Sequence, residues 1–135
     1  MNKILLVEDE GIVRDTLKAV LVQRGYDVLA AADGQEGLSL FKAHSPDLVI
    51  LDRELPKLTG SEVLREIRKF DKRARVIILT GYADEEGEEK YHDLGAAAFL
   101  SKGMGIEAFL QIIERELMKS RSNQGVSSKE RDAKY

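Results

Sequence analysis

Acidic side chains follow two short apolar runs of the chain. Glu8 and Asp9 come directly after the run at 4–7 (ILLV), and Asp52 comes directly after the run at 48–51 (LVIL). If these runs are neighbouring parallel strands, the three carboxylates meet at one edge of a sheet. Carboxylates so close together raise one another's pKa values unless a cation joins them. Mg²⁺ suits such a site, because it binds through one or two carboxylates, keeps several waters and accepts phosphate oxygens.

Two further polar residues end later apolar runs. Thr80 follows the run at 76–79 (VIIL), and Lys102 lies two residues past Leu100. A hydroxyl donor, a mobile positive charge and a divalent cation around one carboxylate form an electrostatic clamp for a transferring phosphoryl group. Asp52 can then act as the nucleophile, as carboxylates do when an aspartyl phosphate forms.

The elements that must position these residues follow from the apolar pattern. The three continuous apolar runs predict strands that are buried on both faces, as in a parallel sheet covered by helices. Two weaker strands are predicted at 27–31 and 96–100. Helical segments alternate with the strands, and the fourth of them is highly charged and marginal. The predicted helices lie at about 13–21, 34–43, 60–69, 84–93 and 106–117.

Strict alternation of strands and helices implies parallel strands joined by right-handed crossovers. We therefore expect an α/β fold with a doubly wound five-stranded parallel sheet, flavodoxin-like strand order 2-1-3-4-5 and helices on both faces. In such a sheet the ligand site lies beyond the carboxyl ends of the strands, at the switch point between strands 1 and 3. This is where the acidic residues are predicted to meet.

Composition excludes several other classes of protein. The chain has 135 residues, no cysteine and a net charge of −3. The length favours one domain, and the lack of cysteine excludes disulfide scaffolds, thiolate metal sites and thiol nucleophiles. The net acidity argues against a general nucleic-acid binder. No apolar run approaches the roughly 20 residues of a membrane span, and no signal peptide is evident, so we expect a cytoplasmic protein with no nucleic-acid or membrane partner.

The charge is uneven along the chain. Five of the 21 basic residues and two of the 24 acidic residues lie at 119–135, so this segment carries +3 and the rest carries −6. The segment has few large apolar side chains to bury. We therefore predict a folded domain at 1–119 and a mobile polar tail at 120–135, which is either a frayed end or a docking or linker segment.

The sequence resembles the receiver domain of two-component response regulators over about 1–119. Each segment that carries the resemblance lies at the carboxyl end of a predicted strand. The segments are ILLVEDE at 4–10, LDRELPKLTG at 51–60, IILTG at 77–81 and GAAAFLSK at 95–102.

The resemblance implies a phosphoacceptor site. Asp52 would accept a phosphoryl group from a histidine kinase or a phosphotransfer partner. Asp9 and Asp52 would bind Mg²⁺ directly, Glu8 would help through water, and the backbone carbonyl of Glu54 would be a further ligand. Lys102 would pair with the phosphoryl group.

The resemblance also implies a switch. Thr80 would hydrogen-bond to the phosphoryl group, and Phe99 matches the aromatic residue that turns inward when the threonine moves. The surface around 84–117 would then be read by a downstream protein partner that the sequence does not name. The protein would be a monomer or a phosphorylation-dependent dimer. It would not be an enzyme beyond catalysing its own phosphorylation and dephosphorylation.

Besides Glu8, which stands where a second aspartate is commoner, three residues depart from the family pattern. Arg53 follows the phosphoacceptor where an apolar residue is usual, and Gly81 replaces a frequent alanine. Gly103 stands where proline usually follows the lysine. Because a cis bond before a residue other than proline costs about 2.5–4 kcal/mol, we expect a trans Lys102–Gly103 bond. We also expect a mobile loop at 102–105 that holds Lys102 loosely until the phosphoryl group arrives.

Other functions fit the sequence less well. A haloacid-dehalogenase-type phosphatase would carry its nucleophile after the first strand, and a flavin binder would not place three acids there. A P-loop motif is absent. A phosphorylation-independent docking module (a pseudo-receiver) and a receiver fragment of a larger transcriptional regulator remain as alternatives.

Overall fold

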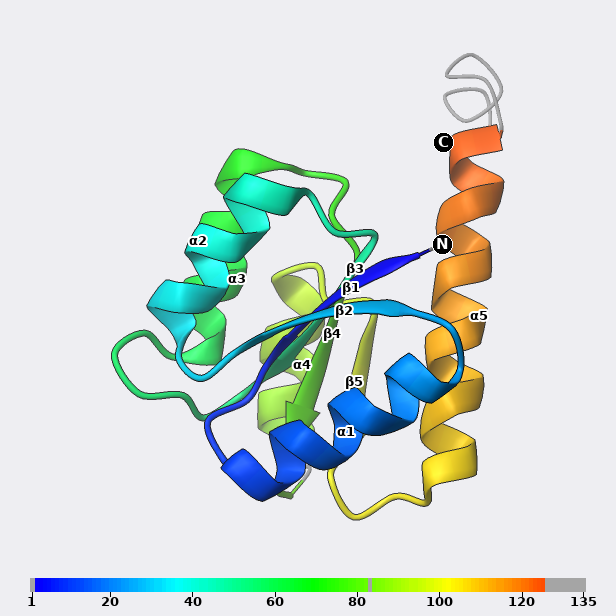
Figure 1. The fold of residues 1–135 in the computed structure, drawn as a ribbon. Coiled ribbons are helices and arrows are strands. Elements are labelled where there is room, and N and C mark those ends of the chain that lie inside the picture. Colours follow the sequence, from blue (N-terminus) through cyan, green and yellow to red (C-terminus); the bar gives the residue numbers. More distant parts are fainter. Residues whose placement is uncertain (1, 83, 126–135) are drawn as a thin grey trace.

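The computed structural model describes residues 2–82 and 84–125, with side chains through Lys119. Its five strands form one parallel sheet in the order β2-β1-β3-β4-β5, which confirms the predicted fold class (Figure 1). The strands are β1 (Lys3–Val7), β2 (Asp27–Ala31), β3 (Leu48–Asp52), β4 (Val76–Thr80) and β5 (Ala98–Ser101).

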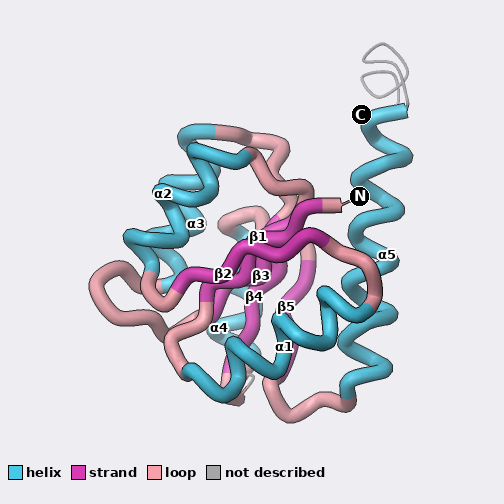
Figure 2. Tube along the Cα trace, viewed as in Figure 1, coloured by secondary structure: helices cyan, strands magenta, loops and turns pink. Residues whose placement is uncertain are grey.

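A helix follows each strand (Figure 2). The predicted domain boundary at 119 lies inside the last helix, which runs to Gly125, and residues 126–135 lie outside the described residues. No helix in the described part of the chain is long and apolar enough to cross a membrane. The helices are α1 (Gly11–Gln23), α2 (Gly34–His44), α3 (Gly60–Phe70), α4 (Glu85–Asp93) and α5 (Ile106–Gly125).

The sheet lies between two helical layers, each with its own apolar core. Helices α2, α3 and α4 cover one face, and α1 and α5 cover the other (Figure 1). Successive residues of a strand point to opposite faces, so Leu5 packs into the first core and Leu6 into the second. The continuous apolar runs follow from this double burial, because neither face of the central strands meets water.

Strand register brings the polar residues together. Val7 of β1 pairs with Leu51 of β3, so Glu8 and Asp52, the next residues along, lie side by side at the carboxyl edge of the sheet. At the same edge, Thr80 pairs with Ser101, the residue before Lys102.

Helix α3 begins against the end of β3. Thr59 and Glu62 form a capping box that fixes its first turn. Gly60 lies so close to the sheet that a Cβ there would sit 2.7 Å from the Asp52 carbonyl oxygen and 2.9 Å from the Arg53 Cα. This glycine therefore lets the helix pack directly behind the residue that ends β3.

We predict that Gly60→Ala lowers the free energy of unfolding by about 1–3 kcal/mol, because the added methyl group overpacks a backbone contact. Urea unfolding followed by circular dichroism measures the change. Gly105→Ala is the matched control, since a Cβ at Gly105 meets no atom within 4 Å. Equal stability of the two variants would contradict the close approach.

Candidate functional site

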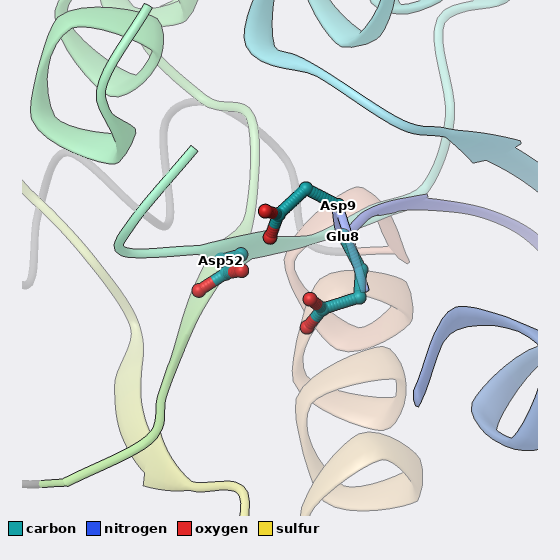
Figure 3. Close-up of side chains that lie close together, drawn as sticks. All are labelled: Glu8, Asp9 and Asp52. Carbon is teal, nitrogen blue, oxygen red and sulfur yellow. The ribbon is translucent and has the colours of Figure 1, made fainter. Parts of the chain in front are cut away.

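Three carboxylates converge at the ends of β1 and β3 (Figure 3). One oxygen from each of Glu8, Asp9 and Asp52 lies within 4.8 Å of the others. Glu8 is fully buried and Asp52 is 2% exposed, whereas Asp9 faces solvent. The predicted meeting of the three carboxylates is therefore confirmed, and two of them lie in the protein interior.

The side chain of Lys102 reaches into this cluster. Its Nζ lies 2.9 Å from Glu8 Oε1, 3.0 Å from Glu10 Oε1 and 3.2 Å from Asp52 Oδ2. The Lys102–Gly103 bond is trans, as expected. The expectation that Lys102 is loosely held is wrong, because three ion pairs fix the ammonium despite the glycines of the loop. Glu10 was not predicted as a site residue; its only signal is its place as the third acid in a row.

The carboxylate oxygens accept few hydrogen bonds. From backbone amides, Asp52 Oδ1 accepts one from Glu54 at 3.1 Å and Glu8 Oε2 accepts one from Glu10 at 3.0 Å, and Lys102 Nζ donates to Glu8 Oε2 at 3.1 Å and to Asp52 Oδ2 at 3.2 Å. Glu8 Oε1 is buried and accepts none from the described residues, since Lys102 approaches it as an ion pair without hydrogen-bond geometry. The charge on this buried oxygen is therefore met by an ion pair rather than by a directed hydrogen bond. The Glu54 carbonyl remains a predicted ligand.

Burial and like charge dominate the electrostatics of the site. Burial raises the pKa of Asp52 to about 7 and the neighbouring Glu8 adds to the rise, although the Glu54 amide and Lys102 oppose it. Burial alone would lower the pKa of Lys102, but Glu8, Glu10 and Asp52 outweigh it and raise that pKa. The Lys102 ammonium therefore stays charged, whereas ionisation of the Asp52 carboxyl group costs free energy in this surrounding.

Thr80 and Phe99 have partners outside the carboxylate cluster. Thr80 is fully buried, and its hydroxyl donates to the Tyr82 carbonyl at 2.7 Å. Phe99 is half-buried and stacks on Tyr91 with 5.8 Å between the ring centroids. The Lys102 amide donates to the Thr80 carbonyl at 2.7 Å, which ties the ends of β4 and β5 together.

The sequence model of the response regulator receiver domain matches residues 4–114. The chain belongs to this family. It is therefore a receiver domain of two-component signalling, a regulatory module whose acidic site has the composition expected of the family.

Known receivers resemble the chain over most of its length. The probable transcriptional regulator ycf27 of Porphyridium aerugineum is 38% identical over 125 residues, which are 90% of this chain and 52% of that protein. The chemotaxis protein CheY of Bacillus subtilis is 32% identical over 117 residues, which are 86% of this chain and 98% of that protein. This receiver thus spans about half the length of the first relative and nearly the whole of the second.

The fold agrees with solved receiver structures. The crystal structure of a CheY-like response regulator receiver domain protein from Methanospirillum hungatei superimposes with a TM-score of 0.87 and 29% identity. The match covers 91% of this chain and 98% of that chain.

We predict that the free energy of unfolding of the metal-free receiver falls as pH rises from about 4 to 7, because Asp52 ionises in this range. The folded-state pKa of Asp52 is about 7 against an ordinary value of 3.8, so the folded state binds the extra proton in this range and unfolding becomes easier as that proton is lost. Asp52→Asn should then be more stable than the parent at neutral pH, by about 1–3 kcal/mol. Near pH 4 that advantage should vanish.

Urea unfolding in EDTA at both pH values measures this difference. The raised pKa of Lys102 acts only in the alkaline range, so it does not interfere. A constant stability difference between parent and Asp52→Asn across the range would contradict the prediction.

Proposed function

We propose that this receiver is a phosphoacceptor, in which Asp52 takes a phosphoryl group from a histidine kinase or a phosphotransfer protein. The observation that carries the proposal is the placement of the Lys102 ammonium 3.2 Å from Asp52 Oδ2 inside a buried group of carboxylates. A solvated surface acid would not need such a partner. A nucleophile that must meet a negatively charged phosphoryl group does.

In the proposed step an Asp52 carboxylate oxygen forms a bond to phosphorus. The bond from phosphorus to the imidazole nitrogen of the donor breaks, and that nitrogen keeps the electron pair. Negative charge is spread over the phosphoryl oxygens during this transfer. Lys102 stabilises that charge, and the Thr80 hydroxyl can donate a hydrogen bond once it leaves the Tyr82 carbonyl.

The donor set at this edge fits Mg²⁺. Hard oxygen ligands are present in Asp9, Asp52 and Glu8, with the Glu54 carbonyl as a further proposed ligand. Lys102 forms ion pairs with three carboxylates, those of Glu8, Glu10 and Asp52, and the Asp9 carboxylate lies close to two of them, so one ammonium leaves the cluster with excess negative charge. When bound, Mg²⁺ would supply positive charge to the phosphoryl oxygens.

The output is proposed to run through Thr80 and Phe99. Movement of the threonine toward the phosphoryl group would open space for the aromatic ring, and the face formed by α4, β5 and α5 would change for a downstream protein partner. We assign this function to the domain at 1–119, as a monomer or as a dimer formed on phosphorylation.

We predict that a small acyl-phosphate donor with Mg²⁺ labels Asp52 and no other residue. Peptide mass spectrometry locates the label. Asp52→Asn should abolish it, and Asp27→Asn, an exposed acid at the amino end of β2, should leave it unchanged. Full labelling of Asp52→Asn would refute the proposed acceptor.

We predict that Asp9→Asn needs roughly tenfold more Mg²⁺ for half-maximal labelling, equivalent to about 1.4 kcal/mol of metal binding. The same variant should be more stable than the parent in EDTA, because one of the repelling charges is gone. Asp15→Asn, an exposed acid of α1, is the control. If Asp9→Asn labels like the parent at limiting Mg²⁺, Asp9 is not a metal ligand.

A further inference from the structure

Arg53 has partners outside the acidic cluster, although it directly follows the proposed phosphoacceptor. Its Nη1 lies 2.9 Å from Asp84 Oδ2, just before α4. Its guanidinium also lies over the rings of Tyr82, 5.6 Å from the ring centroid, and Phe99, 6.0 Å away. One side chain from the end of β3 therefore contacts the residues after β4, the cap of α4 and strand β5.

The carboxylate of Asp84 both caps helix α4 and binds Arg53. Asp84 is the N-cap of α4, where its Oδ1 accepts a hydrogen bond from the Gly87 amide while its Oδ2 binds Arg53. Gly87 leaves room for this arrangement, because a Cβ there would lie 2.8 Å from Arg53 Nη1 and 2.9 Å from Arg53 Cζ. We call Arg53, Asp84 and Gly87 the Arg53 latch.

The Arg53 latch is connected to the hydrogen bond of Thr80 through Tyr82. The Thr80 hydroxyl donates to the carbonyl of Tyr82, the residue whose ring lies under the guanidinium. The backbone of Arg53 is fixed as well, since its amide donates to the Leu79 carbonyl at 2.8 Å. Arg53 is thus anchored on β4 through its backbone and on the start of α4 through its side chain.

We infer that Arg53 is a positioning residue that opposes the switch. It holds Tyr82 and Asp84 where the Thr80 hydroxyl is bound to Tyr82, and so resists delivery of that hydroxyl to a phosphoryl group on Asp52. The inference rests on the proposed phosphoacceptor function. A bound phosphoryl group shifts an equilibrium between two arrangements, and the latch weights that equilibrium toward the one seen here.

The expected size of the effect follows from the contacts. The ion pair is partly exposed, with 22% of the Arg53 side chain and 39% of the Asp84 side chain accessible, so it is modest. The two ring contacts add similar amounts. Together they should change the affinity for a phosphoryl analogue by about three- to tenfold.

Beryllium fluoride with Mg²⁺ serves as the phosphoryl analogue, titrated against the full chain and followed by amide NMR shifts around Thr80. Arg53→Met removes the guanidinium. Asp84→Asn removes the charge but keeps a good N-cap. Gly87→Ala fills the space of the guanidinium while improving helix propensity. All three variants should bind the analogue about three- to tenfold more tightly than the parent.

Two controls separate positioning from a merely structural role. Arg24→Met removes another ion pair, 3.6 Å to Glu107, and should leave the affinity unchanged. The advantage of Asp84→Asn over the parent should shrink in about 1 M NaCl, where charges are screened within about 3 Å. The double variant Arg53→Met/Asp84→Asn should bind no more tightly than Arg53→Met alone.

The results distinguish the latch from the function on which it rests. A parent protein that neither binds the analogue nor labels at Asp52 overturns both proposals. If the parent binds and labels while the three latch variants match it or bind more weakly, the phosphoacceptor proposal stands and the latch is refuted.

Discussion

One ammonium group holds the carboxyl edge of the sheet together. Lys102 places its charge among Glu8, Glu10 and Asp52, two of which are almost completely buried. Removing the ammonium would leave buried carboxylates without a compensating charge, which is strongly destabilising. This contact links the ends of β1, β3 and β5, and it leaves the acids only partly neutralised. The folded state carries the repulsion that a metal ion would relieve.

Parallel topology produces this concentration of charge. All five strands end at the same edge, so residues far apart in sequence come together there without any long loop. The two helical layers bury both faces of the sheet, which leaves this edge as the place where polar side chains can gather. Two helices pack closely against the strands that end at this edge, because Gly37 lets α2 approach Val7 and Gly60 lets α3 approach Asp52.

Sequence patterns predicted the fold and the members of the site, since apolar runs and the residues that end them are local features. They did not predict that Glu8 would be fully buried or that Glu10 would bind Lys102, because these depend on how loops pack. Helix α4 forms despite its weak apolar pattern because the side chain of Asp84 caps it. Helix α5 passes the predicted boundary at 119 because that boundary rests on where large apolar residues become few in the sequence, and a helix can continue beyond its apolar stripe.

Charge balance links the resting arrangement to the proposed switch. In the resting site Lys102 neutralises acids, whereas a phosphoryl group on Asp52 would add negative charge beside the same ammonium. A metal ion held by Asp9, Asp52 and Glu8, as proposed above, would compensate the charge of these acids and leave Lys102 for that group, so metal binding and phosphoryl transfer would favour each other. Arg53 takes no part in this exchange, because its guanidinium forms an ion pair with Asp84. The proposed acceptor site and the start of α4 thus each have a cation of their own, and Thr80 is the residue whose hydroxyl is proposed to change partners.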